Sequence, residues 1–241
     1  MKLALGCLLV LVSIVIYFAY PLWRAIHVSK KIEEYTVAYE QHPNDPTLHI
    51  LVAGDSTGVG TGASAAEDST AGRIGKDFPN ADIVNVSKNG ITTEGLRVIL
   101  DSMPNIRYDL IVIQIGANDV TSFAPEKQTA ESLTQILDYA ESHASSTVVL
   151  TAGNIGRSAV FKYPLSKLIT SRTLTIRKMF QDEISKRSSV TFVDLFKNSV
   201  DETFNSDKNT YYAEDHFHPS SAGYGVWYQE IGPVIRKDLS S

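Results

Sequence analysis

The clearest chemical signal in this sequence is the run HILVAGDSTGVGTGA at residues 49–63, where an apolar stretch ends at a glycine and Ser56 follows. A serine hydroxyl is a weak nucleophile at neutral pH, and it needs a general base within hydrogen-bond reach. An imidazole can take that role when a carboxylate holds its second nitrogen. The segment DHFHP at 215–219 supplies both groups. Ser56 and this segment therefore contain what acyl transfer through a serine requires.

Asp215 can orient either of the two imidazoles in this segment. His218 follows three positions later, so one turn of the chain can place the carboxylate beside its ring. His216 is the next residue, and in an extended segment its ring could point the same way. The spacing alone leaves both histidines open as the base.

Acyl transfer also requires fixed hydrogen-bond donors for the negative oxygen of the tetrahedral intermediate. The segments Asn89-Gly90 and GAND at 116–119 each follow an apolar run and offer such donors. We expect three of them: the backbone N–H of Ser56, the backbone N–H of Gly90 and the side-chain amide of Asn118. A glycine suits position 90, because a side chain there would obstruct the substrate.

The fold must bring these segments together, and the apolar runs indicate how. Five runs have the length of strands and alternate with helical patterns; they lie at 49–54, 81–87, 108–116, 146–153 and 190–196. Strands that are apolar throughout and alternate with helices predict a five-stranded parallel sheet in a three-layer α/β/α sandwich. Ligands of such sheets bind outside the carboxyl ends of the strands. All four chemical segments follow strands and are therefore expected to face one crevice.

The helical candidates lie between these strands. Their expected positions are near 66–78, near 93–102, from Pro125 onward, within 165–187 and within 220–238. Gly232-Pro233 should kink or break the last helix, because proline lacks the N–H that a helix interior needs. Asp119 is expected to cap the helix after the third strand, and we assign it this structural role rather than a place in the site.

The N-terminal segment differs in character from the rest of the chain. Residues 3–23 carry no charge, and about 20 apolar residues span the core of a bilayer. We expect a single-pass transmembrane helix over residues 1–23, with a cleaved signal peptide as the alternative. Cationic residues after the run favour a C-terminal domain inside the cell, whereas the short basic start resembles an export signal. We take the domain to be extracytoplasmic.

Residues 24–46 connect this segment to the remainder, which we expect to form one catalytic domain over 47–241. A juxtamembrane helix is predicted there from an apolar stripe at Val28, Ile32, Tyr35 and Tyr39. The turn-forming sequence HPNDP at 42–46 should end this helix.

Composition excludes several classes of protein. The formal net charge of −5 provides no basic field for nucleic acid, so we expect no nucleic-acid partner. The single cysteine, Cys7, rules out a disulfide framework within the chain and a cysteine-based metal cluster.

The four chemical segments together resemble the four sequence blocks of the SGNH (GDSL) hydrolases. They occur in the family's order and each follows a predicted strand; they are GDS at 54–56, NG at 89–90, GAND at 116–119 and DHFHP at 215–219. The resemblance extends from residue 49 to about residue 238. It implies a flavodoxin-like sheet and a serine esterase mechanism, with no metal or organic cofactor.

The same resemblance implies a role for each site residue. Ser56 would be the nucleophile and the first oxyanion donor, and Gly90 and Asn118 would be the other donors. It favours His218 over His216 as the base, with Asp215 as its partner.

Two other motifs lead to different interpretations. GDSTG also fits G-x-S-x-G, the nucleophile elbow of α/β-hydrolases, but those enzymes place several strands before the elbow. Gly58, Gly60 and Ala63 fit G-x-G-x-x-A, a fingerprint of dinucleotide binding, which would make the chain a non-catalytic nucleotide-binding module. That fingerprint needs an acidic residue at the end of the second strand, and this strand ends in Asn85-Val86-Ser87.

Our expectation is therefore a membrane-anchored serine ester hydrolase that acts through an acyl-enzyme. Its substrate would be a small-molecule, lipid or glycan ester, with lipids and acetylated envelope glycans as candidates. An O-acyltransferase would use the same site, with a sugar hydroxyl in place of water. Residues 155–172 and the insertion at 197–214 are expected to shape the substrate pockets.

Overall fold

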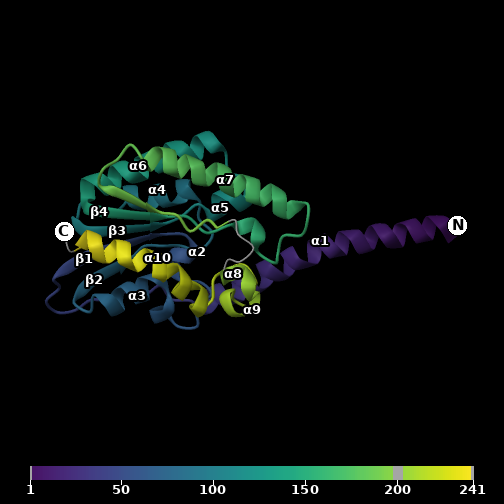
Figure 1. The fold of residues 1–241 in the computed structure, drawn as a ribbon, viewed down its shortest axis with the longest axis horizontal. Helices are drawn as coiled ribbons and strands as arrows, with labels where there is room; N and C mark the ends of the chain where they lie inside the picture. The colour runs from purple at the N-terminus through teal and green to yellow at the C-terminus, as the bar shows by residue number, and fades with distance from the viewer. Residues whose placement is uncertain (1, 198–202, 240–241) are drawn as a thin grey trace.

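The computed structural model describes residues 2–197 and 203–239. Its centre is a five-stranded sheet in the order β2-β1-β3-β4-β5, and every neighbouring pair is parallel (Figure 1). The strands are β1 (Leu48–Gly54), β2 (Ala81–Asn85), β3 (Tyr108–Gln114), β4 (Ala144–Leu150) and β5 (Val190–Val193). This order is the flavodoxin-like one, so the predicted parallel sheet and fold class are confirmed.

Helices cover both faces of the sheet. Alternate strand residues point to opposite sides, so that Leu51 and Ile111 belong to one apolar core whereas Ile50 and Leu110 belong to the other. The first core is closed by α4 (Thr93–Asp101), α6 (Glu126–His143) and α7 (Leu165–Ile184). The second core is closed by α3 (Thr70–Asp77) and α10 (Ser221–Leu239). In Figure 1 α4, α6 and α7 lie above the strands, α3 lies below them and α10 crosses in front of them; with helices on both faces, the fold is a three-layer sandwich.

The strand register brings the carboxyl ends of the central strands to one edge. Gly54 pairs with Gln114 at the ends of β1 and β3. A Cβ on Gly54 would lie 2.0 Å from the carbonyl oxygen of Gln114, so only glycine fits there. The chain leaves β1 directly into the four-residue helix α2 (Ser56–Val59). It leaves β3 into α5 (Ala117–Thr121), so the segments of interest start side by side.

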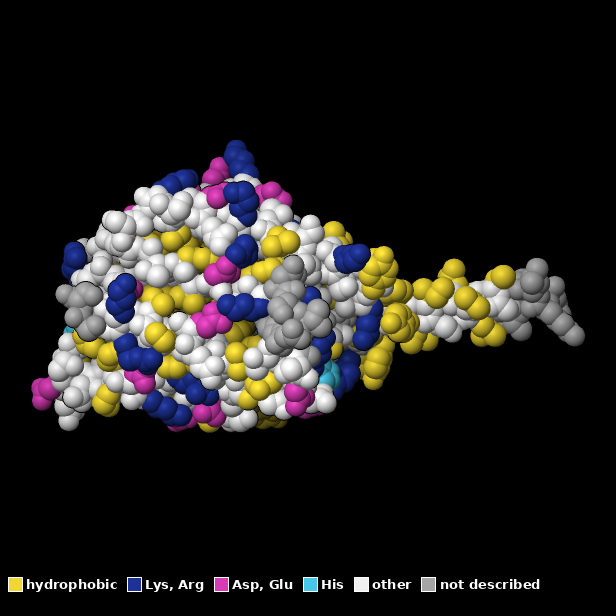
Figure 2. Space-filling model, viewed as in Figure 1, with side chains coloured by type: hydrophobic (Ala, Val, Ile, Leu, Met, Phe, Trp, Pro, Cys, Tyr) yellow, Lys and Arg dark blue, Asp and Glu magenta, His cyan; other side chains and the backbone are white. Residues whose placement is uncertain are grey.

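The N-terminal helix α1 (Lys2–Tyr35) is a single element that extends away from the domain (Figure 1). It is long and apolar enough to cross a membrane, and a signal sequence near an N-terminus has the same character. Its outer part carries exposed apolar side chains, whereas charged groups are scattered over the domain surface (Figure 2).

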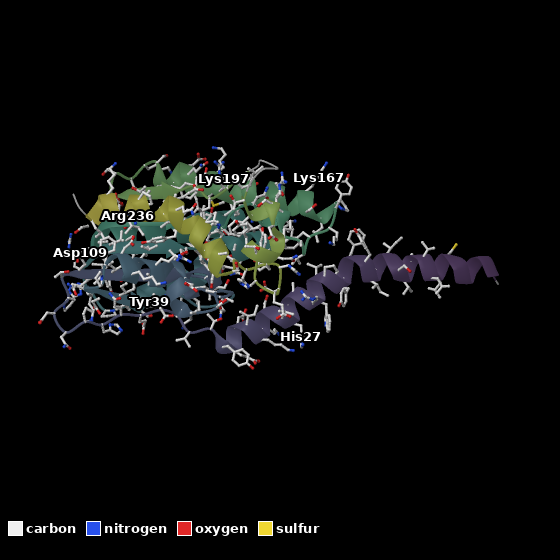
Figure 3. All side chains as sticks on the ribbon, turned by 60° about the horizontal axis from the view of Figure 1, so that its bottom comes forward. His27, Tyr39, Asp109, Lys167, Lys197 and Arg236 are labelled. Atoms are coloured by element: carbon white, nitrogen blue, oxygen red, sulfur yellow. The ribbon has the colours of Figure 1, made fainter. Side chains whose placement is uncertain are left out.

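The helix ends earlier than the sequence pattern predicts. It stops at Tyr35, and HPNDP does not end it. The following chain is extended because Gln41 forms an antiparallel bridge with Ile83 on the outer edge of β2. Tyr39 therefore lies off the helix and against Gly75 of α3, on the body of the domain (Figure 3).

Some other boundaries also differ from those predicted. The expected helix over 66–78 is a 3₁₀ turn (Ala66–Asp68) followed by α3, because the Ser69 hydroxyl caps the N–H of Gly72. We expected Gly232-Pro233 to kink or break the last helix, and the structure shows no break there. Helix α10 continues through Pro233, and Ile231 and Ile235 hold it to the core on either side.

The predicted insertion at 197–214 is partly helical. It contains α8 (Thr203–Ser206) and α9 (Lys208–Tyr211), while residues 198–202 lie outside the described residues. In Figure 1 both short helices lie where α1 meets the domain.

Candidate active site

Ser56 occupies the first position of α2, at the carboxyl edge of the sheet. Asp55 lies between β1 and α2 and is the N-cap of α2. Its Oδ1 accepts hydrogen bonds from the Thr57 N–H (2.9 Å) and the Thr57 hydroxyl (2.8 Å). The Asp55 N–H donates to Gln114 O at 2.9 Å, which fixes the turn to β3. The Ser56 side chain is thus held at a defined point, and the residue is only 5% exposed.

His218 lies between Ser56 and Asp215. Its Nε2 is 2.9 Å from the Ser56 Oγ, and its Nδ1 is 2.6 Å from Asp215 Oδ2. With the proton on Nδ1, the ring donates to the carboxylate and accepts from the serine hydroxyl. Both His218 and Asp215 are buried. The structure therefore forms a continuous hydrogen-bonded chain from Asp215 through His218 to Ser56, an arrangement that can activate a serine.

His216 does not take part in this chain. Its backbone has a positive φ of 56°, and its carbonyl accepts a hydrogen bond from the Ser158 hydroxyl at 2.8 Å. The turn at His216 thus presents the ring of His218, and not that of His216, to Ser56.

Four hydrogen bonds hold the carboxylate of Asp215. Its Oδ1 accepts from the N–H groups of Phe217 (2.9 Å) and His218 (3.0 Å). Its Oδ2 accepts from His218 and from the hydroxyl of Ser29, which is 2.8 Å away on α1. Burial raises the pKa of Asp215, but the contacts with His218, Phe217 and Ser29 outweigh it and leave this pKa below its usual value. Asp215 is therefore a stable anion beside the imidazole.

Asp55 has the opposite electrostatic environment. Complete burial raises its pKa to about 6, although the two hydrogen bonds from Thr57 oppose the rise. Within the described residues its Oδ2 has no hydrogen-bond partner. The residue before Ser56 therefore changes charge near pH 6.

The predicted oxyanion donors lie in segments tied to one another. Lys88 N–H donates to Gly54 O (3.0 Å), which holds the 88–90 turn against the end of β1. The Asn118 amide donates to Ile91 O at 2.9 Å, which joins the third segment to the same turn. In the part of the chain that the structure describes, neither the Ser56 nor the Gly90 N–H meets a protein acceptor.

The backbone and surroundings of Gly90 explain its residue type. Its φ of +75° favours glycine, and a Cβ there would meet no atom within 4 Å. The space in front of Gly90 is thus open, as expected if a side chain at this position would obstruct the substrate.

Asp119 has a structural role, but not the predicted one. Its carboxylate does not cap its own helix α5. Instead Oδ2 accepts from the N–H and hydroxyl of Thr93 at the start of α4, and Oδ1 accepts from the Thr129 hydroxyl on α6. The interaction spans the fold, so local sequence could not reveal it.

A cavity opens beside Ser56 and His218. Its walls combine apolar and aromatic side chains with several polar ones and one arginine; they include Ile155, Phe204, Tyr212, Phe217, Trp227, Thr57, Asn154, Ser158 and Arg157. Gly90 and Asn118 are not among the residues that line it. Parts of both segments expected to shape substrate pockets, 155–172 and 197–214, do line the cavity.

Sequence reasoning missed two of these aromatic residues. Phe217 lies between the two histidines of DHFHP, and its ring packs edge-on against His218 with 5.1 Å between centroids. Trp227 comes from α10 and stacks on Phe204 at 5.9 Å. An aromatic residue inside a catalytic motif is a signal that could have been used, whereas nothing in the sequence relates Trp227 to the site.

No cluster of three or more potential metal ligands occurs in residues 2–197 and 203–239. The dinucleotide fingerprint also lacks its geometry. Gly60 has a φ of 91° and ends helix α2, whereas phosphate-binding glycines precede a helix.

Comparison with known proteins identifies the family. The sequence pattern of the GDSL-like lipase/acylhydrolase family matches residues 52–226, which include Ser56, Asp215 and His218. The chain belongs to this family. A GDSL lipase/acylhydrolase is an ester hydrolase. In this chain Ser56 follows β1, the first strand of the sheet, whereas the nucleophile elbow of α/β-hydrolases follows several strands.

One curated relative is the GDSL-like esterase Rv1075c of Mycobacterium tuberculosis, which is 24% identical over 200 residues. The match covers 80% of this chain and 63% of that protein, so this GDSL family member spans less than two thirds of its relative's length.

Solved structures share the fold. A member of the lipolytic G-D-S-L family from Veillonella parvula has a TM-score of 0.60 at 14% identity, covering 77% of this chain and 97% of that one. The lipase Lip_vut3 from a goat rumen metagenome has a TM-score of 0.58 at 17% identity, covering 78% and 97%. The GDSL chain thus has the architecture of its family.

Proposed function

We propose that this chain is a serine ester hydrolase in which Ser56 is the nucleophile, His218 the general base and Asp215 its orienting carboxylate. The observation that carries the proposal is the 2.9 Å approach of His218 Nε2 to Ser56 Oγ. Membership of the GDSL-like lipase/acylhydrolase family supports the same reaction class.

The reaction begins when His218 takes the hydroxyl proton of Ser56 and Oγ attacks the ester carbonyl carbon. The resulting oxyanion accepts hydrogen bonds from the N–H groups of Ser56 and Gly90 and from the Asn118 amide. Asp215 stabilises the imidazolium that forms. His218 then gives its proton to the leaving alcohol, and the C–O bond breaks to leave an acyl-serine.

The second half of the reaction repeats these steps with water. His218 removes a proton from water, the hydroxide oxygen attacks the acyl carbon, and a second tetrahedral intermediate forms. Collapse of this intermediate releases the acid and returns the proton to Ser56. No further group is required for the balance of atoms and charge.

The substrate we propose is an ester with an apolar acyl chain, such as a lipid ester; an acetylated envelope glycan, whose acyl group is only a methyl, is the alternative. The aromatic wall of Phe204, Phe217 and Trp227 supports an apolar group beside the nucleophile. The course of α1 supports a substrate in or at a membrane. Trp23 ends the apolar run, and Ser29, which contacts Asp215, lies only about 9 Å further along the helix at 1.5 Å per residue.

We further propose that residues 1–23 anchor the protein as a single-pass helix, that 24–46 connect this anchor to the domain, and that the catalytic domain of 47–241 is extracytoplasmic. The continuity of α1 from the apolar run to Tyr35 supports an anchor that is rigidly joined to its connecting segment.

A series of p-nitrophenyl esters of increasing acyl length, hydrolysed by the full chain and by S56A, tests this function. Each methylene that enters the cavity contributes about 0.8 kcal/mol, so kcat/KM should rise about fourfold per methylene until the cavity is filled. Equal hydrolysis by S56A would refute the serine mechanism. A flat chain-length profile in the wild type would refute the apolar substrate while leaving the mechanism intact.

A further inference from the structure

The part of α1 beyond the apolar run lies against the loop that carries Asp215. Arg24 Nη1 donates to the backbone carbonyl of Glu214 at 2.9 Å, and the Ser29 hydroxyl donates to Asp215 Oδ2 at 2.8 Å. Ala25, between them, is 6% exposed although it belongs to a helix that is otherwise mostly open to solvent. His27 marks this stretch of the helix in Figure 3. The contact is therefore a packed interface.

Ser29 differs from the other partners of Asp215 in where it comes from. The N–H groups of Phe217 and His218 and the imidazole of His218 all belong to the same short loop as the carboxylate. Among the described residues, Ser29 is the one donor to Asp215 from another element, 186 positions away in the sequence. The loop alone holds Oδ1 with two backbone donors, but it holds Oδ2 only through the imidazole that Oδ2 must orient.

We propose that Ser29 is a positioning residue for the catalytic base: its hydroxyl fixes Asp215 Oδ2, and Asp215 in turn fixes the ring of His218. The inference rests on the proposed function, because it assigns a role relative to the Ser56–His218–Asp215 chain. On this proposal, the turn of α1 that carries Ser29 contributes to catalysis and does not only connect the apolar helix to the domain.

Loss of the Ser29 hydroxyl has two physical consequences. The carboxylate gains freedom about its side-chain torsion, so the imidazole is less often aligned with Ser56. The hydrogen bond from Ser29 also helps to lower the pKa of Asp215, so its removal raises the pKa of this carboxyl group. The first effect lowers kcat, and the second moves the acid limb of the pH profile upward.

The test uses the full chain in detergent with a p-nitrophenyl ester, comparing wild type, S29A and T36A. Thr36 is the matched control, because it follows the same helix and its hydroxyl bonds to the carbonyl of Ile32 and not to the site. For S29A we expect kcat to fall about tenfold, the scale of one hydrogen bond to a charged group, with KM within about twofold. The acid limb of kcat/KM should move to higher pH, and T36A should behave as wild type.

A double variant separates positioning from general damage. In a D215A background, S29A should cause no further loss in the rate of labelling by a fluorophosphonate, because the group on which Ser29 acts is gone. The inference is overturned if S29A matches T36A in kcat and pH profile, or if its full loss persists in D215A. If S29A unfolds at a lower temperature than wild type, the double variant still distinguishes the two explanations. A folding defect would lower the labelling rate of D215A further, whereas a lost positioning role would not.

The two proposals fail in different ways. If S56A is inactive while S29A is fully active with an unchanged pH profile, only the role of Ser29 is wrong. If S56A retains wild-type activity, the proposed function itself is wrong.

Discussion

His218 Nε2 lies 2.9 Å from Ser56 Oγ, although 162 positions of sequence separate the two residues. The turn that makes this possible contains His216 at a positive φ of 56°. His216 is therefore part of the turn, whereas the ring of His218 contacts Ser56.

This relationship predicts unequal effects of the two histidines. H218A should lower kcat/KM by about 10³-fold or more, because the nucleophile loses its base. H216N should stay within about threefold of wild type, since asparagine tolerates the left-handed backbone at that position. Steady-state hydrolysis of a p-nitrophenyl ester measures both. A larger loss in H216N than in H218A would reverse the assignment of the base.

The Asn118 amide gives a second prediction. N118A should lower kcat about 10²-fold with little change in KM, because an oxyanion donor acts in the transition state and is worth about 3 kcal/mol. S122A is the control, since the Ser122 hydroxyl bonds to the Asn118 carbonyl without offering a donor to the site. A kcat for N118A as high as that of S122A would remove Asn118 from the oxyanion hole.

The buried carboxylate of Asp55 predicts a pH-dependent stability. Burial raises its folded-state pKa from 3.8 to about 6. The folded protein therefore retains a proton that the unfolded chain releases, and stability falls as pH rises through this interval. Between pH 5 and pH 8 the two pKa values correspond to a loss of about 1 kcal/mol.

D55N isolates this contribution. The amide oxygen can still accept the two hydrogen bonds from Thr57, but the side chain no longer titrates. Denaturant unfolding of both proteins at pH 5 and pH 8 should show the variant gaining about 1 kcal/mol relative to wild type at the higher pH. If the difference in unfolding free energy between D55N and wild type were the same at pH 5 and pH 8, the raised pKa of Asp55 would be contradicted.

The sheet could be predicted from the sequence because the polarity of each strand residue reflects whether its side chain is buried. The run at 108–116 is apolar at every position because Leu110 faces one core and Ile111 the other, and this continuous pattern is what a sheet covered on both faces requires. The position of the segments after β1 and β3 could also be predicted, because the loops at the carboxyl ends of parallel strands meet at one edge of the sheet, where ligands bind.

The remaining features depend on contacts between distant elements. Tyr39 continues a helical stripe, yet the edge of β2 pairs with Gln41 and draws the chain out of the helix. Asp119 caps α4 rather than its own helix, across 26 positions. Ser29 has no local pattern that relates it to Asp215, because its significance arises only when α1 packs on the 213–215 loop.

The most direct test of the account is covalent labelling of the full chain by a fluorophosphonate, which traps an activated serine. S56A should abolish labelling, whereas S64A, an exposed serine outside the site, should be labelled at the wild-type rate. Labelling of S56A at an unchanged rate would show that the activated serine lies elsewhere and would contradict the central claim.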